Sequence, residues 1–398
     1  MKTIQRFLSA SATLLLAAAA PLAAQPLAGD CLIGPQLGAS LLFPYFEVEA
    51  DDPGGMTTSI AINNGYHDPR LARVVLWSDW GNPVLAFDVY LGRFDIVTIN
   101  LRDVMNGVIP STGAGADLSA FPFCGSLPPT HTNPVLSESG RAQLVNRLTG
   151  KSDPPLANTC YGENHDDGRP RGYITVDAVR ECSGVSVGDV SYAPNDTTYP
   201  YFGNGATTGI ASYDNALYGD IVYIDPSENL ADGSEAVVLW ADPTRFNTSP
   251  VFTFYGRFSG YDGRDHRVPL PNIWNMRFLN GGPFVGGASA IVYHDPGAPA
   301  VGAASCNTGP STFPLPGLIS VTDEDGHTLS VDNSLPMSLA TRKTSVSGLG
   351  LPYAAGFLQL TTVNSQMWVQ AVLSARTRFS LGFNATPVAF LCGETPVL

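Results

Sequence analysis

One stretch of the chain decides the fold: residues 71–103, with the sequence LARVVLWSDWGNPVLAFDVYLGRFDIVTINLRD. It predicts three β-strands, at residues 72–77, 84–91 and 96–101. Each segment alternates between two faces and is dense in β-branched and aromatic residues, which favour strands. The residues between the first two strands, DWGNP, are typical of a turn.

The middle strand indicates how this sheet packs. Phe87, Val89 and Leu91 alternate with Asp88 and Tyr90, and side chains two residues apart share one face of a strand. An antiparallel sheet with one apolar face buries that face against a second layer, which is typical of a β-sandwich. We therefore expect a sheet with one buried face.

Similar signals continue on both sides of this stretch. One helix is expected at residues 138–148, where apolar residues recur near helical spacing and Gly150 follows as a stop signal. Pro44, in the first expected strand, suits an edge position. The other expected strands cover residues 41–48, 57–62, 172–179, 220–224 and 236–240, and residues 318–331 predict a hairpin.

The second half of the chain repeats these signals in the same order. The shared order favours an internal duplication, although two independent β domains would also give such matches. A polar segment with two prolines, residues 242–250, would join the halves. The matched pairs are residues 42–48 with 252–258, 57–65 with 274–282, 73–83 with 289–299, 172–179 with 356–363, and 222–243 with 369–387.

Residues 1–24 predict a secretory signal peptide. Lys2 and Arg6 precede an apolar run at residues 7–20, and small residues suited to cleavage follow. The run is shorter than the ~20 residues that span a bilayer, which disfavours the alternative of a retained anchor. We expect export to the periplasm, the cell surface or the medium, no transmembrane span, and a lead-in at residues 25–39.

Charge and motif content exclude several partners. The net charge is −14 at pH 7, and loss of Lys2 and Arg6 with the leader would make the chain more acidic. The sequence has no basic cluster, so nucleic acid and anionic membranes are poor partners. It also lacks a P-loop and a Rossmann fingerprint, and no cofactor is expected.

Six cysteines follow the leader, and an even number in an exported chain favours three disulfides. Other pairings are possible for six cysteines, but a short loop around one strand and bonds within one domain are the simplest arrangement. The expected pairs are Cys31–Cys124, Cys160–Cys182 and Cys306–Cys392.

Several segments together resemble those of a group of secreted bacterial proteins with no assigned activity. They are LLFPYFEV, VVLWSDWGNPVLAFDVYL, INLRD, RGYITVD, YGRF and FLNGG. The β units are also similar to the immunoglobulin-like (Ig-like) sandwich modules of bacterial surfaces. We therefore predict a mainly β protein with two antiparallel Ig-like β-sandwich domains, at residues 40–243 and 251–396, and one short helix inserted in the first.

Two motifs match functional sites only in part. Residues 184–188, GVSVG, match the G-x-S-x-G nucleophile motif, but the strand-to-helix context that this motif needs is missing. Residues 323–326, DEDG, could offer oxygens to Ca²⁺, but the other positions of an EF-hand loop are absent, which favours a hairpin turn. No metal site is expected.

The best binding candidate is a tyrosine-rich insertion at residues 190–218, which the second half lacks. Tyrosine offers a flat amphipathic ring, and Asn and Asp add adaptable hydrogen bonds, a composition that suits a glycan or protein surface. The alternative is that the rings fold back and fill the core. The expected contact residues are Tyr192, Asn195, Asp196, Tyr199, Tyr201 and Phe202.

Two functions follow from these observations. The first is a secreted or surface-displayed, non-enzymatic protein with a structural or adhesive role, which binds a glycan or an extracellular protein. The alternative is a secreted hydrolase that uses loop carboxylates such as Asp166, Asp167 and Asp265. Convergence of two such acids and a histidine in one cleft would favour the hydrolase.

Overall fold

The computed structural model describes most of the chain beyond residue 36. It covers residues 37–110, 121, 135–153, 157–182, 186–187, 193–195, 201–203, 209–244, 253–259, 264–281, 284–295, 304–307, 318–331, 339–346, 349, 351, 353–362, 365–375 and 378–390. Several features expected from the sequence lie outside these residues: the signal peptide, Cys31, Cys124, Tyr192, Asp196, Tyr199 and Cys392.

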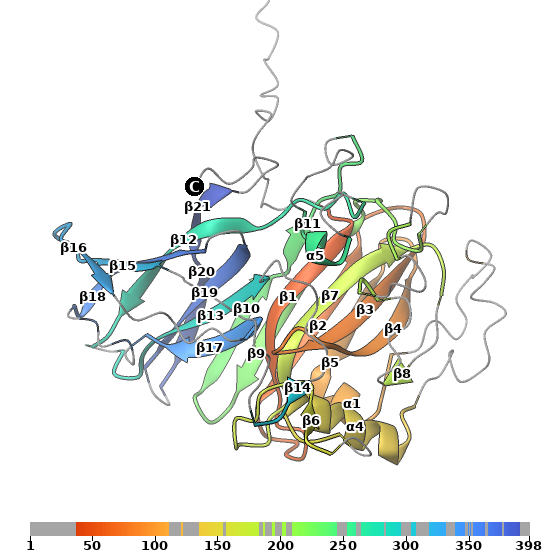
Figure 1. Cartoon of the computed structure of the whole chain (residues 1–398), viewed down its shortest axis with the longest axis horizontal. Helices are drawn as coiled ribbons and strands as arrows, with labels where there is room; N and C mark the ends of the chain where they lie inside the picture. Colours follow the sequence, from red (N-terminus) through yellow and green to blue (C-terminus); the bar gives the residue numbers. More distant parts are fainter. Residues whose placement is uncertain are drawn as a thin grey trace, which may run out of the picture. The chain divides into compact units, whose positions relative to one another are not determined.

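The described chain is mainly β, as predicted, and its first half forms two antiparallel sheets (Figure 1). The larger sheet has the order β11 (Val237–Leu239), β1 (Ser40–Glu47), β7 (Arg171–Val179), β3 (Arg70–Ser78), β4 (Pro83–Leu91) and β8 (Ser186–Val187). The smaller sheet has the order β10 (Leu230–Glu235), β9 (Leu217–Asp225), β2 (Thr57–Asn64) and β5 (Ile96–Asn100).

The second half also forms two antiparallel sheets, drawn from teal to blue in Figure 1. One has the order β16 (Thr328–Val331), β15 (Leu318–Thr322), β18 (Ala355–Thr361), β12 (Pro271–Leu279) and β21 (Thr386–Phe390). The other has the order β17 (Thr341–Ser345), β13 (Gly287–Asp295), β19 (Gln366–Ser374) and β20 (Ser380–Asn384). A further small sheet pairs one strand from each half, β6 (Thr159–Cys160) and β14 (Ala304–Ser305).

The described helices are α1 (Leu101–Met105), α4 (Glu138–Leu148) and α5 (Gly256–Ser259). The helix α4 has the predicted bounds. Ser137 accepts a hydrogen bond from the Gly140 amide at its start, and Gly150 follows its end with a φ of 63°. The helix α1 is absent from the sequence-based prediction, which extended β5 by one residue.

The sheet topology repeats between the two halves. In the first half, β2 lies between β5 and β9, and β3 lies between β4 and β7. In the second half, β12 lies between β18 and β21, and β13 lies between β17 and β19. The corresponding strands also follow the same order along the chain. They are β2, β3, β4, β5, β7 and β9 in the first half and β12, β13, β17, β18, β19 and β21 in the second.

This topology corrects three of the five sequence matches. Residues 57–65 and 274–282 do correspond, as β2 and β12, and β3 corresponds to β13. The counterpart of β7 is β19 rather than β18, because β18 pairs with β12. Since β19 corresponds to β7, residues 369–387 are not the counterpart of residues 222–243. The sequence matches residues 252–258 to residues 42–48, which overlap β1, but α5 begins at Gly256, inside the matched segment. A short apolar strand does not specify which neighbour it pairs with, so the local resemblance was misleading.

The strand β1 is not an edge strand, contrary to the prediction from Pro44. It lies between β11 and β7. The pairing with β11 covers only Ser40 to Leu42, and the register on β7 breaks between Phe43 and Phe46. The sheet accommodates the missing N–H of proline at this irregularity.

The three strands predicted in residues 71–103 are present as β3, β4 and β5, but the larger sheet is buried on both faces. Along β3, Ala72, Val74 and Leu76 belong to a cluster with the smaller sheet. Val75 and Trp77 point to the opposite face and join a cluster that includes second-half residues. The expectation of one buried face is therefore wrong for this sheet, because residues distant in sequence cover its polar side.

No helix among the described residues is both long enough and apolar enough to cross a membrane.

Candidate functional site

Two aromatic rings of the tyrosine-rich insertion, those of the expected contact residues Tyr201 and Phe202, lie in the core. Tyr201 is 1% exposed and Phe202 is 8% exposed. The Tyr201 hydroxyl donates a hydrogen bond of 2.8 Å to Asp177 on β7, and the two rings meet edge to face. Asn195 is partly buried, and its Oδ1 has no hydrogen-bond partner among the described residues. Tyr201 and Phe202 therefore cover the larger sheet rather than form an exposed surface.

Asp177 is the centre of a buried polar network. Its carboxylate also accepts hydrogen bonds from Ser40 Oγ and from the Tyr255 hydroxyl, the latter at 3.0 Å. Arg267 Nη2 lies 3.8 Å from Asp177 Oδ1. Burial raises the pKa of Tyr201 and Tyr255 well above the ordinary value of a tyrosine. The network joins both halves and is closed to solvent, which gives it a structural role.

Asp265, an acid of the hydrolase hypothesis, is also fully buried. It accepts hydrogen bonds from Thr253 Oγ1 and, at 2.8 Å, from the Tyr255 amide. Burial raises its pKa to about 6. Asp166 is exposed, whereas Asp167 lines the cleft described next. The three acids named from the sequence therefore do not share one pocket.

A polar cleft of about 800 Å³ lies between the two halves. Its first-half wall consists of residues from β1, from the loop before β7 and from the turn between β9 and β10. Its second-half wall consists of residues from β13, β17, β19 and β20. The volume is within the range of roughly 300–1,000 Å³ that is typical of ligand sites. Charged and hydroxyl side chains form much of the lining, which favours a hydrophilic ligand.

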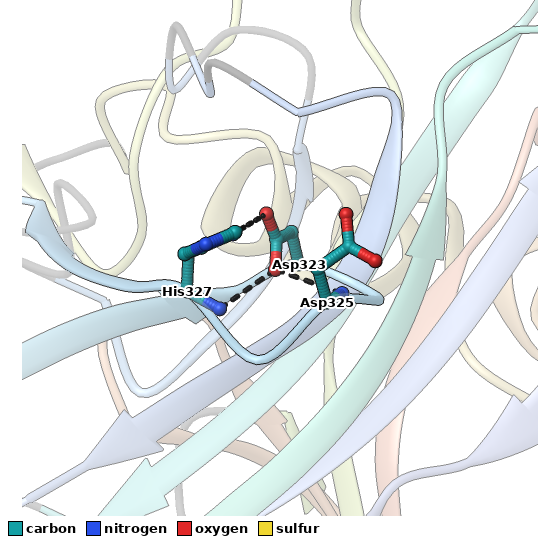
Figure 2. Close-up of side chains that lie close together, drawn as sticks. All are labelled: Asp323, Asp325 and His327. Carbon is teal, nitrogen blue, oxygen red and sulfur yellow. Dashed lines mark hydrogen bonds and ion pairs between the residues drawn. The ribbon is translucent and has the colours of Figure 1, made fainter.

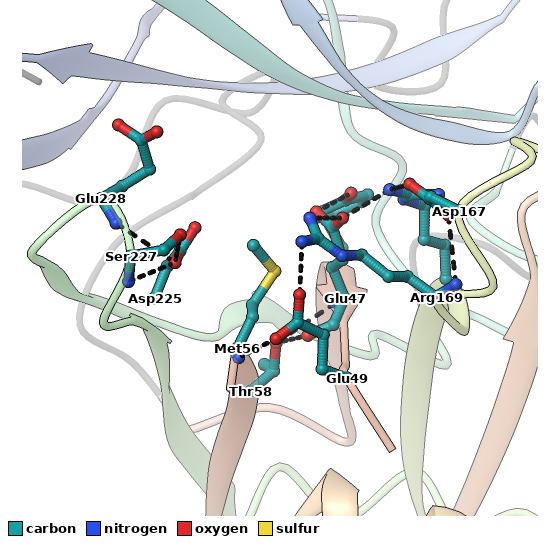
Figure 3. A network of polar contacts seen from close by, with 11 residues as sticks. Glu47, Glu49, Met56, Thr58, Asp167, Arg169, Asp225, Ser227 and Glu228 are labelled. Carbon is teal, nitrogen blue, oxygen red and sulfur yellow. Dashed lines mark hydrogen bonds and ion pairs between the residues drawn. The ribbon is translucent and has the colours of Figure 1, made fainter. Parts of the chain in front are cut away.

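The first-half wall carries a network of paired charges (Figure 3). Arg171 lies between Glu47 and Asp167 and contacts one carboxylate oxygen of each at 2.5 Å. Arg169 pairs with Glu49 and lies 3.4 Å from Glu47. Burial acts to raise the pKa of Asp167, but the hydrogen bonds and charges of the two arginines outweigh it and lower this pKa. Asp167 is thereby favoured in its ionised form, and the arginines neutralise the carboxylates that they contact.

The turn between β9 and β10 reaches across the cleft. Asp225 Oδ1 accepts hydrogen bonds from the Ser227 amide and hydroxyl and from the Glu228 amide, which fixes the turn (Figure 3). On the opposite wall, Ser374 Oγ donates a hydrogen bond of 3.4 Å to Glu228. The two halves thus meet at this end of the cleft.

A histidine also faces the cleft. His165 Nε2 lies 2.9 Å from Asp79 Oδ2, and its side chain is 21% exposed. The other Asp79 oxygen accepts a hydrogen bond of 3.0 Å from the Glu163 amide. Burial raises the pKa of Asp79 despite the hydrogen bond with His165. The pair anchors this loop to the turn after β3, and it also orients a histidine as acid–base catalysis would require.

Asp323, Asp325 and His327 come close together at the tip of the β15–β16 hairpin (Figure 2). Asp323 Oδ1 accepts hydrogen bonds from the amides of Asp325, at 3.0 Å, and His327, at 2.7 Å. His327 Nδ1 lies 2.9 Å from Asp323 Oδ2. These bonds are those of a tight turn, in agreement with the hairpin predicted from the sequence.

Ser186, the central residue of the GVSVG motif, lies in β8. This two-residue strand pairs with β4, with Ser186 opposite Ala86. It is an antiparallel edge pairing and not the strand-to-helix turn on which a nucleophile elbow depends.

The structure corrects the disulfide pairing. Cys160 bonds to Cys306, which links β6 in the first half to β14 in the second. Cys182 is disulfide-bonded as well. The expected Cys160–Cys182 and Cys306–Cys392 bonds are therefore wrong. The error came from assuming that each bond stays within one half.

Apart from Asp167, the cleft residues named above escaped the sequence-based prediction, because they come from segments far apart in the chain. One local signal was available. The segment DGRPR, residues 167–171, alternates an acid and two arginines, and all three lie in the charge network.

No protein-family model, curated protein or solved structure matches this chain.

Proposed function

We propose that this protein is exported and non-enzymatic, has an adhesive or structural role, and binds a glycan in the cleft between its halves. The observation that carries this proposal is the lining of the cleft. Serine and threonine hydroxyls both donate and accept hydrogen bonds, as sugar hydroxyls do. On the first-half wall, Glu47 and Asp167 are paired with arginines, and an acid with a lowered pKa such as Asp167 is a poor proton donor near neutral pH.

The remaining expectations agree with this proposal. The leader at residues 1–24 supports export to the periplasm, the cell surface or the medium. The repeated strand topology supports two related β-sandwiches of the Ig-like kind, with the cleft at their junction. The segments that resemble those of secreted bacterial proteins, and the likeness of the β units to the Ig-like sandwich modules of bacterial surfaces, point the same way.

An array of glycans and matrix proteins, probed with residues 25–398, tests the proposal. Ser345 lies exposed on the cleft wall, whereas Ser330 lies exposed on β16, away from the cleft. We expect the wild-type chain and Ser330→Trp to bind glycans, and Ser345→Trp to lose that binding. Equal binding by all three chains, or binding to proteins alone, would overturn the proposal.

One observation favours a second candidate, a hydrolase. His165 faces the cleft and is oriented by Asp79 at 2.9 Å. In that case a glycan bound by the array assay would be cleaved, and His165→Gln would abolish the release of reducing ends while binding persists. Stable glycan after long incubation with the wild-type protein would exclude this candidate.

A further inference from the structure

The second-half wall of the cleft carries a lysine beside a group of hydroxyls. Lys343 and Ser345 are two residues apart on β17 and share one face of the sheet. Ser289 on β13 lies opposite Ser345, and Ser374 on β19 lies opposite Ser380 on β20. These three serines share the sheet face of Lys343 and Ser345. All five side chains line the cleft.

Lys343 differs from the arginines of the cleft in having no close partner. Arg169 and Arg171 are paired with carboxylates, and Arg342 has interactions of its own. Lys343 forms neither a side-chain hydrogen bond nor an ion pair with any described residue.

Asp232, an acid whose charge interacts with that of Lys343, is already engaged elsewhere. Asp232 accepts hydrogen bonds from Gln370 Nε2, at 3.1 Å, and from the Gly382 amide, at 3.0 Å. Its charge acts on Lys343 only over a longer distance. The ammonium group therefore has donors left for a ligand, since lysine carries three N–H donors.

One of the hydroxyls beside Lys343 also has unused hydrogen-bonding capacity. Ser380 Oγ is buried and has no hydrogen-bond partner among the described residues. An extended peptide would present mostly backbone groups and side chains, whereas a saccharide presents several hydroxyls around each acidic group. Such a ligand matches a lysine surrounded by serines.

Building on the proposed glycan function, we propose that Lys343 makes the cleft selective for acidic saccharides, that is, sugars that carry carboxylate or sulfate groups. The ammonium group would contact the anion and the serines would contact neighbouring hydroxyls. A hydrogen bond to a charged group is strong enough to give about tenfold or more in affinity. The contribution should weaken as salt concentration rises.

Titration calorimetry of residues 25–398 with oligosaccharides of matched length tests this inference. The probes are neutral dextran, polygalacturonate and dextran sulfate, and the two acidic probes show which anion is preferred. The variants are Lys343→Met, Lys343→Arg, and Lys151→Met as the control, because Lys151 is the other lysine after residue 24 and is exposed on a loop. We expect the wild type, Lys343→Arg and Lys151→Met to prefer an acidic probe about tenfold or more, and Lys343→Met to lose that preference.

The outcomes separate the inference from the proposed function. If the wild type bound the neutral and acidic probes with equal affinity and Ser345→Trp abolished that binding, the role of Lys343 would be overturned. The proposed glycan binding in the cleft would stand. Unchanged selectivity in Lys343→Met would also overturn the role of Lys343. So would a wild-type affinity for poly-glutamate equal to its affinity for the acidic saccharides. Absence of any saccharide binding by the wild type would overturn the proposed function itself.

Discussion

Tyr201 donates its hydroxyl hydrogen to Asp177 across 2.8 Å, and this bond ties the tyrosine-rich insertion to the middle of the larger sheet. Both residues are buried. The bond explains why a loop of surface-like composition includes core residues: the sheet face beneath it is polar, and a phenol satisfies a buried carboxylate while its ring excludes water.

We expect Tyr201→Ala to lower the free energy of unfolding by about 3–5 kcal/mol, because it removes a buried ring. Tyr201→Phe should cost about 1–3 kcal/mol, because it removes one donor to a buried carboxylate. Urea unfolding followed by fluorescence measures both. Tyr66→Phe is the matched control, since Tyr66 is 42% exposed, and it should change stability by less than about 0.5 kcal/mol. Wild-type stability in Tyr201→Ala combined with lost ligand binding would instead make this ring a contact residue.

Asp265 and His294 should give opposite pH dependences of stability. Burial raises the pKa of Asp265 to about 6 from 3.8, so between about pH 4 and pH 6 the folded state holds a proton that the unfolded state lacks. Burial, with the charge of Arg257, lowers the pKa of His294 to about 3 from 6.5, so here the unfolded state holds the extra proton. Stability falls with rising pH for Asp265 and with falling pH for His294, by about 1.4 kcal/mol per pH unit each. The two effects cancel in the wild type.

Removing one group should therefore expose the other. Asp265→Asn keeps an acceptor for the Tyr255 amide, and its NH₂ group can donate to Thr253 Oγ1. Relative to the wild type, we expect this variant to lose about 3 kcal/mol of stability on going from pH 6 to pH 4, and His294→Gln to gain a similar amount. Urea unfolding at pH 4, 5 and 6 gives these slopes. If both variants keep the wild-type slope, the two groups do not titrate as described.

The Cys160–Cys306 bond closes a loop with a sequence separation of 146 residues. Cross-links of this kind typically stabilise a fold by about 2–4 kcal/mol, chiefly by restricting the unfolded chain. We expect the Cys160→Ser/Cys306→Ser variant to lose stability in that range and to weaken glycan binding, since the bond links the two halves between which the cleft lies. Non-reducing peptide mapping of the wild type checks the pairing directly, and a peptide that joins Cys160 to Cys182 would contradict it.

Local signals were sufficient to predict much of the secondary structure. The helix α4 begins with a capping serine, Ser137, and ends before a glycine, Gly150, so both signals lie next to the helix in the sequence. The strands β3, β4 and β5 likewise follow from alternation and turn residues. These features depend on short-range sterics and hydrogen bonding, which the sequence contains directly.

The features that depend on distant contacts could not be predicted in this way. Arg73 and Asp88 mark a polar face by alternation, yet both are fully buried and paired at 2.7 Å. Only the second half and the insertion, packed over that face, make the pairing necessary. The cleft has the same origin, since Glu47 and Lys343 come from opposite ends of the chain and neither carries a local motif.

The two halves should unfold together, although all the described sheets but the β6–β14 pair lie within one half. Trp77 from β3 stacks on Phe258 from α5 with ring centres 5.6 Å apart, and Thr341 Oγ1 donates a hydrogen bond to the Pro44 carbonyl. The hydrophobic cluster around Trp77 contains residues of both halves, so separation would expose apolar surface on each. We expect scanning calorimetry of residues 25–398 to show a single transition whose van't Hoff and calorimetric enthalpies agree. Trp77→Ala should lower its midpoint as one unit, in keeping with about 3–5 kcal/mol of lost packing. Two resolved transitions, with only one moved by Trp77→Ala, would show instead that the halves are independent domains and that their contact adds little to stability.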